Sequence, residues 1–417
     1  MRIIYTLLIR VAAPFVLLRL WWRARRQPEY LQHVGERFGY FGGSGATQAA
    51  SPMPLIWLHA VSVGETRAAE PLVHALRLHY PDHRILLTHM TPTGRAAGEA
   101  LFGSTVMRCY LPYDFPGAVA RFLDRFAPSV GILMETEIWP NLVQVCKAHA
   151  TPLYLVNARL SEKSFTRYQH VGTLTMDTLR ALTAIAAQSA DDARRFEALG
   201  ATGVAITGNL KFDVAPSGVH RALGEHLRES FGARRVLLAA STREGEELLF
   251  INNKLHELPE TLLVLVPRHP QRFDEVAALL DQHHIRFQRR SANAPLHPDT
   301  RVLLGDSMGE MVAYYAACDV AFIGGSLLPF GGQNLIEACA VGKPVLIGPH
   351  THNFAEATER AITAGAAVRV MDAADLQRKA AALLDNPNVT ERMSAAALAF
   401  SGEHRGATQK LLDLIRF

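Results

Sequence analysis

Acidic residues follow short apolar segments at two points in the first half of the chain. Glu65 ends the segment HAVSVGE at 59–65, directly after an apolar run. Glu135 and Glu137 follow the apolar run that ends at Met134. A carboxylate at a helix start can act in catalysis or merely complement the helix dipole, and taken alone Glu65 favours the second interpretation. Two acids directly after a buried strand are expected at the mouth of a cleft.

The second half of the chain carries loops suited to an anionic ligand. Ser241 lies in ASTREGEE (240–247), where a strand, a Ser-Thr pair and a helix start offer backbone N–H groups and an arginine to a phosphate. Arg268 and His269 follow the next strand with two potentially cationic side chains. These positions predict a phosphate-binding edge on a second sheet.

A glycine-rich segment at 324–337 strengthens that prediction. Its two glycine pairs let the backbone approach a ligand, and the helix beginning near Gln333 presents Asn334 and Glu337 on neighbouring turns. This arrangement suits a nucleotide whose phosphate lies at the helix start and whose ribose hydroxyls meet a carboxylate. One glycine pair is weak evidence, but five polar loops at equivalent places in the chain are stronger evidence.

Several nucleotide and metal motifs are missing from the sequence. The only Gly-Lys pair is followed by Pro344, so there is no P-loop, and no dinucleotide fingerprint follows a strand. No Asp-x-Asp occurs, which disfavours a metal-clamped sugar diphosphate. His350 and His352 could hold a metal, but a histidine pair without nearby partners is more often a polar loop. We therefore expect neither a metal nor a cofactor.

Short apolar runs that alternate with helical patterns must position these loops. Each run is apolar on both faces, as in a parallel sheet covered by helices on both sides. The predicted strands are 55–60, 84–90, 130–134, 153–157, 184–188 and 204–207 in a first series, and 236–240, 262–267, 302–304, 320–324 and 344–348 in a second. Residues 212–232, broken by Pro216 and Gly218, are interpreted as a hinge. Two doubly wound αβα domains separated by a cleft follow, at 55–215 and 216–402, and the helix 403–417 is expected to return to the first.

The N-terminal segment 1–38 is apolar and basic. Residues 1–37 contain seven arginines and two glutamates, a net charge of +5, whereas the whole chain carries +4. This uneven distribution excludes a basic nucleic-acid-binding surface. A helix in the membrane interface, with Trp21 and Trp22 at headgroup level and Arg23, Arg25 and Arg26 on anionic lipid, is favoured over a single span and over a packed core helix. The arginines predict a cytoplasmic body, and the Gly- and Ser-rich stretch 39–54 predicts a flexible link.

Taken together, these loops resemble those of the Kdo transferases, a family of inverting glycosyltransferases of the GT-B fold, with two Rossmann-like domains facing across a cleft. The resemblance covers nearly all of the chain after residue 55, in the family's order. The matching stretches are HAVSVGE (59–65), TPTG (91–94), ETEIWPNL (135–142), NARLSEKS (157–164), GNLKFD (208–213), ASTREGEE (240–247), VPRHPQRF (266–273), MGEM (308–311), GGSLLPFGGQNLIE (324–337) and GPHTHNF (348–354).

The resemblance implies transfer of Kdo from CMP-Kdo to a tetraacyl lipid A precursor (lipid IVA), with inversion, at the inner membrane. It implies that Glu65 is the general base and that Glu135 lies on the acceptor side, in the first domain. The implied CMP-Kdo site in the second domain consists of Ser241, Arg268, Met308, Gly309, Glu310, Asn334 and Glu337. No nucleic acid and no obligatory protein partner is implied.

One position departs from the family pattern, and two other functions stay open. Many members have histidine where this chain has Gln333, which cannot become cationic, so Gln333 receives no role. A soluble GT-B-like epimerase or hydrolase would share the nucleotide loops but would not need the N-terminal anchor. A non-catalytic, membrane-attached binder of a nucleotide sugar would use Glu65 only as a dipole partner.

Overall fold

The computed structural model describes residues 1–25, 27–42, 53–213 and 218–416. The chain forms two compact units, Met1–Val214 with Arg405–Phe417, and Ala215–His404. The predicted link at 39–54 lies outside the described residues over 43–52, as do Arg26 and the predicted boundary between 215 and 216. Before that gap, the ring of Phe41 packs edge-on against Phe126 of the first unit.

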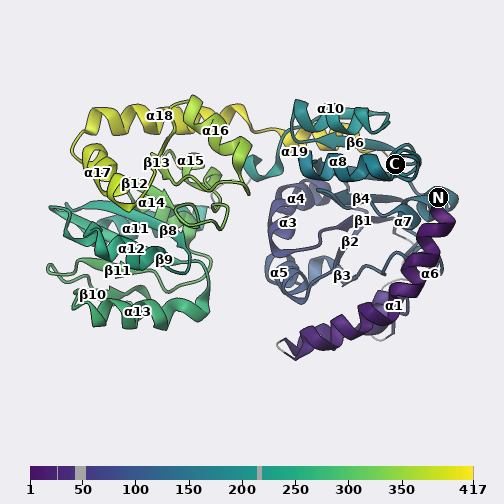
Figure 1. Cartoon of the computed structure of the whole chain (residues 1–417), viewed down its shortest axis with the longest axis horizontal. Coiled ribbons are helices and arrows are strands. Elements are labelled where there is room, and N and C mark those ends of the chain that lie inside the picture. The colour runs from purple at the N-terminus through teal and green to yellow at the C-terminus, as the bar shows by residue number, and fades with distance from the viewer. Residues whose placement is uncertain (26, 43–52, 214–217, 417) are drawn as a thin grey trace. The chain divides into compact units, whose positions relative to one another are not determined.

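The first unit contains a seven-stranded parallel sheet in the order β3-β2-β1-β4-β5-β6-β7. Helices cover both of its faces (Figure 1). The strands are β1 (Leu55–His59), β2 (Arg84–His89), β3 (Met107–Tyr110), β4 (Val130–Met134), β5 (Leu153–Ala158), β6 (Ala184–Ala187) and β7 (Val204–Ile206). The helices of its body are α3 (Val63–Ala68), α4 (Glu70–His79), α5 (Pro92–Phe102), α6 (Pro116–Phe126), α7 (Pro140–Ala148), α8 (Glu162–His170), α9 (Gly172–Leu179), α10 (Ala190–Ala198) and α19 (Ala407–Leu414).

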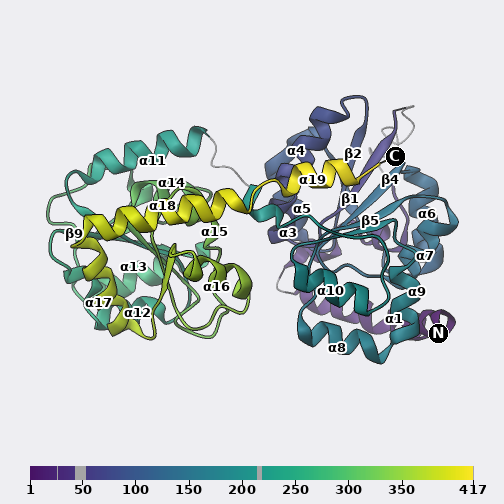
Figure 2. The ribbon, with the colours of Figure 1, turned by 90° about the horizontal axis from the view of Figure 1, so that it is seen from above.

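Alternating residues of β1 show why both faces of this sheet are covered. Ile56 and Leu58 join a buried cluster with residues of α4, α5 and α19, whereas Leu55 and Trp57 join a second cluster with residues of α6 and α7. Successive side chains of a strand point to opposite faces, so a strand apolar at every position needs helices on both sides. The last helix, α19, lies beside α4 (Figure 2) and contributes Leu411 to the first unit's core.

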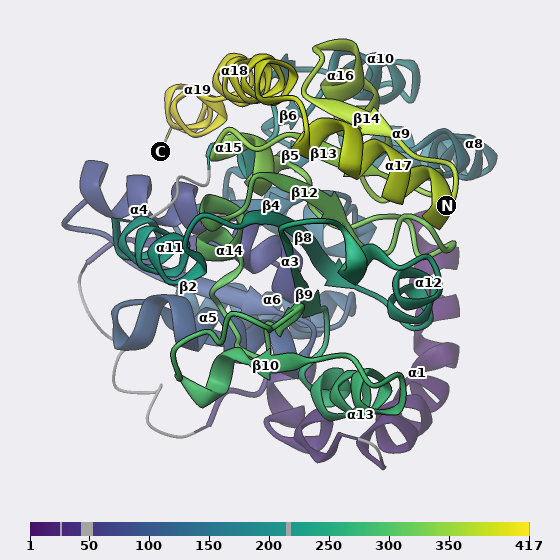
Figure 3. The same ribbon diagram turned by 90° about the vertical axis from the view of Figure 1, so that its left-hand side faces the viewer.

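The second unit repeats the architecture with a parallel sheet in the order β10-β11-β9-β8-β12-β13-β14. In Figure 3, α12, α13 and α17 lie on one side of this sheet, and α11 and α14 lie on the other. The strands are β8 (Arg235–Thr242), β9 (Thr261–Pro267), β10 (Phe287–Arg289), β11 (Val302–Leu304), β12 (Val320–Ile323), β13 (Val345–Ile347) and β14 (Ala367–Arg369). The helices are α11 (Gly218–Phe231), α12 (Glu246–Asn252), α13 (Phe273–Gln282), α14 (Met311–Ala317), α15 (Ile336–Ala340), α16 (Ala355–Thr363), α17 (Ala373–Leu384) and α18 (Pro387–Glu403).

The hinge predicted at 212–232 is wrong over most of its length. Residues 218–231 form the helix α11, which buries Leu227 and Phe231 and packs along α14. The residue pattern that looked polar is amphipathic, with one apolar face that packs on α14. Pro216 lies outside the described residues.

The N-terminal segment forms the helix α1 (Arg2–Ala24), which is attached to the first unit along one stripe. The residues not fully exposed recur at helical spacing: Tyr5, Thr6, Ile9, Ala13, Val16, Leu20 and Ala24. The Tyr5 hydroxyl donates to Asp114 (2.9 Å) and the Thr6 hydroxyl donates to Asn141 (2.9 Å). The opposite face exposes Leu8, Phe15 and other large apolar side chains. By length and composition α1 could cross a membrane, which is weak evidence of membrane association.

Candidate active site

Glu65 lies in the first turn of α3, just after β1. Its carboxylate turns back over the helix start, where Oε2 accepts the Val61 N–H (2.8 Å) and Oε1 accepts the Ser62 hydroxyl (3.2 Å). Ser62 is the N-cap residue of α3. Glu65 therefore satisfies donors at the helix end, as expected if it only stabilises the start of the helix.

Electrostatics separate Glu65 from an ordinary helix-start acid. Burial, and then the nearby charge of Glu135, raise its pKa to about 8, against the opposing hydrogen bond from Val61. An exposed glutamate at a helix N-terminus would be stabilised as a carboxylate and would have a low pKa. A carboxylate whose pKa lies near 8 is well matched to removing a proton from a hydroxyl group near neutral pH.

Glu135 directly follows β4 and lies within electrostatic range of Glu65. Its backbone has a φ of +59°, a left-handed conformation that costs a non-glycine residue free energy. The Lys211 ammonium group lies 3.5 Å from Glu135 Oε1. Lys211 therefore pairs with a carboxylate whose charge acts on Glu65.

Glu137 belongs to the same cluster, although the sequence analysis gave it no role. The Trp139 indole N–H donates to its carboxylate (2.6 Å), and burial raises its pKa, as does the charge of Glu135. Glu137 in turn contributes to the raised pKa of Glu65. Two acids spaced by one residue after a strand were the available signal, but only the fold brings both of them to Glu65.

The histidines beside this cluster are unsuited to take up a proton. Burial lowers the pKa of His59 to about 3 and that of His89 to about 4. His59 Nδ1 lies 2.9 Å from the Thr88 hydroxyl, and His89 Nδ1 lies 2.9 Å from the Ala60 carbonyl oxygen. Both rings are thus held as neutral groups at the ends of β1 and β2.

In the second unit, Asn334 and Glu337 meet at the start of α15. The Asn334 amide donates to Glu337 (3.0 Å), and its carbonyl oxygen accepts the Ile336 N–H (3.1 Å), which closes the helix end. The charges of Glu337 and Arg268 both act on the buried phenol of Tyr315, so these residues share one neighbourhood. The structure therefore brings together three of the predicted donor-site residues.

Ser241 and the glycine-rich segment 324–337 lie against each other. Ser241 has a φ of +56°, and a side chain at Gly324 would come within 2.5 Å of its carbonyl oxygen, so only glycine fits there. The Arg268 N–H donates to the carbonyl oxygen of Thr242, the residue after Ser241 (3.0 Å). Buried Glu246 accepts the N–H groups of Gly325 and Leu327 and fixes the loop.

The turn 308–310 precedes α14. Met308 is exposed, Gly309 has a φ of +82°, and Glu310 accepts the Ser307 hydroxyl (2.7 Å) while pairing with Arg290 (3.2 Å). Glu310 is thus already neutralised within the unit. The Gln333 N–H donates to the Gly324 carbonyl oxygen (3.0 Å), so its backbone helps to close the glycine-rich loop.

Comparisons with known proteins first define the class of this protein. Residues 281–399 match the family model of the glycosyl transferases group 1. A UDP-GlcNAc 2-epimerase from Neisseria meningitidis, solved with UDP-GlcNAc, has a TM-score of 0.60 and covers 87% of this chain and 99% of its own, at 14% identity. That likeness shows the fold alone. The fold and the model match define a glycosyltransferase of the GT-B type, as the sequence predicted.

Closer relatives define the family. Residues 32–214 match the model described as 3-deoxy-D-manno-octulosonic-acid transferase (kdotransferase). The 3-deoxy-D-manno-octulosonic acid transferase of Bordetella pertussis is 46% identical over 99% of this chain and 98% of its own length. That of Haemophilus influenzae is 38% identical over 100% and 98%. The chain belongs to the Kdo transferase family, which confirms the resemblance and excludes the epimerase, hydrolase and non-catalytic alternatives.

Proposed function

We propose that this enzyme transfers Kdo from CMP-Kdo to a hydroxyl group of a tetraacyl lipid A precursor (lipid IVA), with inversion at the anomeric carbon. In this mechanism the Glu65 carboxylate takes the proton of the acceptor hydroxyl group. The acceptor oxygen then bonds to the anomeric carbon of Kdo. The bond between that carbon and the CMP phosphate oxygen breaks, and CMP leaves with the electron pair.

The observation that carries this proposal is the acidic cluster around Glu65. The pKa of Glu65 is raised to about 8 by burial and by the charge of neighbouring Glu135. A base with this pKa keeps enough driving force to attract a hydroxyl proton and is still partly ionised near neutral pH. We assign Glu135 to the acceptor side of the same site, where Lys211 balances its charge.

The proposed donor site is the group of loops in the second unit. Arg268 and the N–H groups of the glycine-rich loop would bind the phosphate of CMP-Kdo and stabilise it as it departs. Ser241 would bind beside them, Glu337 and Asn334 would bind the ribose, and the turn 308–310 would complete the site. These groups supply the leaving-group stabilisation that a metal gives in other enzymes, so we expect activity in EDTA.

The proposed location is the inner membrane, with both units on the cytoplasmic side. The exposed apolar face of α1 would lie among acyl chains, with Trp21 and Trp22 at headgroup level. Arg23 and Arg25 at the end of α1 would meet anionic lipid. A lipid acceptor would then reach the acidic cluster from the membrane surface.

The test is an assay in detergent with CMP-Kdo, lipid IVA and EDTA, in which the product mass counts the Kdo units added. We expect Glu65→Gln to lower kcat by about a hundredfold or more while CMP-Kdo binding is retained, because glutamine cannot take a proton. Glu197→Gln, on the surface of α10, is the matched control and should be unchanged. Full activity of Glu65→Gln would remove the base assignment, and absence of transfer by the wild type would remove the proposed acceptor.

A further inference from the structure

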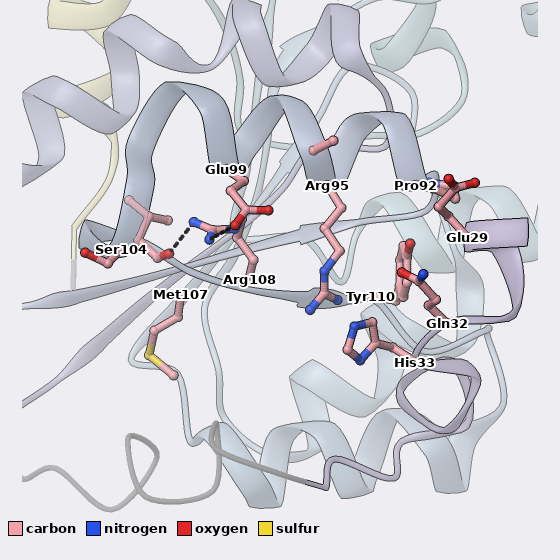
Figure 4. A pocket seen from close by; sticks show the side chains of 12 residues that line it. Glu29, Gln32, His33, Pro92, Arg95, Glu99, Ser104, Met107, Arg108 and Tyr110 are labelled. Atoms are coloured by element: carbon pink, nitrogen blue, oxygen red, sulfur yellow. Dashed lines mark hydrogen bonds and ion pairs between the residues drawn. The ribbon is translucent and has the colours of Figure 1, made fainter. Parts of the chain in front are cut away.

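A polar pocket opens on the first unit, lined by the segment that follows α1, by α5 and by β3 with the residues just before it. Its volume is about 520 Å³. Gln32 and His33, which follow α1 in the chain, line one side, while Arg95 of α5 and Arg108 of β3 line the other (Figure 4). A cavity of this size fits a sugar-sized ligand. None of its residues has a role in the proposed reaction.

Arg95 presents its guanidinium group to this pocket with one side already fixed. Its Nη1 donates to Glu36 (2.8 Å), whose same oxygen accepts the Tyr110 N–H (2.8 Å). The guanidinium group also lies over the Tyr110 ring, 5.1 Å from its centre. Within the described residues its remaining nitrogen atoms have no hydrogen-bond partner. Two donors on a held, flat cation match the geometry of a phosphate group.

Arg108 adds a second cation that is poorly neutralised. Its Nη1 donates to backbone carbonyl oxygens, and its nearest acid, Glu99, lies 3.8 Å away and is 72% exposed. Burial lowers the Arg108 pKa, and the charge of Arg95 lowers it further, so the two cations repel each other. The other lining acid, Glu29, is exposed at the rim. A bound anion would relieve this repulsion.

The pocket is connected through the chain to α1 and through hydrogen bonds at the start of α5 to the loop that carries Glu65. The Thr91 hydroxyl at the start of α5 donates to the Val61 carbonyl oxygen (3.2 Å), and the Val61 N–H donates to Glu65. Arg95 follows one turn later on α5. On the other side, Gln32 follows the end of α1, which exposes Trp21 and Trp22. One wall of the pocket thus belongs to the helix that is linked to the Glu65 loop, and the opposite wall continues from α1.

We propose that this pocket binds a phosphate group on the sugar headgroup of the lipid acceptor, with Arg95 and Arg108 on the phosphate and Gln32 and Glu99 on sugar hydroxyl groups. The inference rests on the proposed function, because it assumes a glycolipid acceptor. It adds an acceptor-selecting site that holds the headgroup while its free hydroxyl group meets Glu65.

The test compares acceptors with and without phosphate on the disaccharide, at saturating CMP-Kdo. We expect Arg95→Gln to raise KM for the phosphorylated acceptor by about tenfold or more, because a charge-assisted hydrogen bond is lost. The KM for the dephosphorylated acceptor and for CMP-Kdo should stay within twofold, and Arg95→Lys should be intermediate. Arg194→Gln, an exposed arginine of α10, is the control. Equal KM changes for both acceptors would overturn the proposal.

A second variant serves as the control for misfolding. Arg95→Gln leaves Glu36 buried without its cation, whereas Glu36→Gln with Arg95→Gln removes both charges and keeps an acceptor for the Tyr110 N–H. The double variant should melt close to the wild type and show the same selective KM increase. A folded double variant with wild-type KM for the phosphorylated acceptor would overturn the proposal.

Two further measurements separate the alternatives. The first distinguishes a failure of the pocket proposal from a failure of the proposed transfer reaction, and the second distinguishes a sugar phosphate from a phospholipid as the ligand. A deacylated disaccharide phosphate, titrated without CMP-Kdo, should bind the wild type about tenfold more tightly than Arg95→Gln even if no Kdo is transferred. If the wild type and Arg95→Gln bound it equally, the pocket proposal would be wrong, whereas the proposed transfer reaction would be unaffected. Vesicles of phosphatidylcholine with and without phosphatidylglycerol test the bilayer as the source. If Arg95→Gln weakened only vesicle binding, the pocket would bind a phospholipid and the proposal would be wrong.

Discussion

The two units share a scaffold but carry opposite charges at the loops that follow their strands. Both sheets are parallel and seven-stranded, and in both the first strand of the unit lies inside the sheet and not at an edge. In the first unit the loops after β1 and β4 bring together Glu65, Glu135 and Glu137. In the second unit the loops after β8 and β9 carry Ser241 and Arg268. One fold thus holds a cluster of acids in one copy and a cationic, glycine-rich site in the other.

The physical environment explains how each set suits its proposed task. Burial around the acids disfavours their charged form, so the pKa of Glu65 rises and the group becomes a usable base. The glycine-rich loop, fixed by Glu246, instead directs backbone toward a ligand that is already an anion. The comparison predicts that variants in the first unit change proton transfer and acceptor use, whereas variants in the second change donor use.

The largest effect that tests this separation is expected at Arg268. Arg268→Gln should lower kcat/KM for CMP-Kdo by about a hundredfold or more, because a cation that stabilises the departing phosphate is lost. The KM for the acceptor should stay near the wild-type value. Initial rates with each substrate varied in turn give both numbers. Arg286→Gln, which changes an exposed arginine of the same unit, is the control. If Arg268→Gln raised the KM of both substrates to a similar extent, the assignment of donor binding to the second unit alone would be wrong.

A smaller effect is expected in the pH dependence of the reaction. The base must be ionised to accept a proton, so kcat/KM should rise with pH and level off above about 8, the pKa of Glu65. Glu135→Gln should move this midpoint to lower pH, because the charge of Glu135 helps to raise that pKa. Arg268→Gln should leave the midpoint in place. If Glu135→Gln left the midpoint unchanged, the group that ionises in the pH profile would not be Glu65 in this acidic cluster.

Most strands were predictable from the sequence, and the three that were not share a cause. The missed strands β3, β10 and β14 all lie at edges of their sheets, and each contains an arginine. A central strand is buried on both faces and must be apolar throughout, whereas an edge strand is half solvated and tolerates charge. Periodicity of apolar residues therefore identifies the central strands, and of the four edge strands it finds only β7.

In the candidate site, features that depend on neighbouring residues in the sequence were predictable, and features that depend on residues far apart in the sequence were not. Arg268 could be singled out because it directly follows an apolar strand, whereas Glu65 was assigned as the base only through the resemblance to the Kdo transferases. The raised pKa of Glu65 could not be predicted, because it depends first on burial and then on carboxylates far along the chain that the fold brings near. Lys211 is likewise distant in sequence from its partner Glu135. The hinge predicted at 212–232 was wrong over 218–231, because Gly218, which was interpreted as a break, is the first residue of α11.

The smallest expected effect concerns the attachment of α1 to the acidic half of the molecule. Tyr5 donates to Asp114, and the same carboxylate accepts the N–H groups of Asn141 and Leu142 at the start of α7, just beyond the acids 135–137. Tyr5→Phe should cost about 1 kcal/mol of stability, since one hydrogen bond is lost while the ring is kept. Thermal melting measures this cost, with exposed Tyr40→Phe as the control. Because α7 follows the acidic loop, any change in kinetics should appear in the KM of the lipid acceptor and not in that of CMP-Kdo. A change confined to CMP-Kdo would show that α1 acts on the second unit instead, against the separation of roles proposed for the two halves.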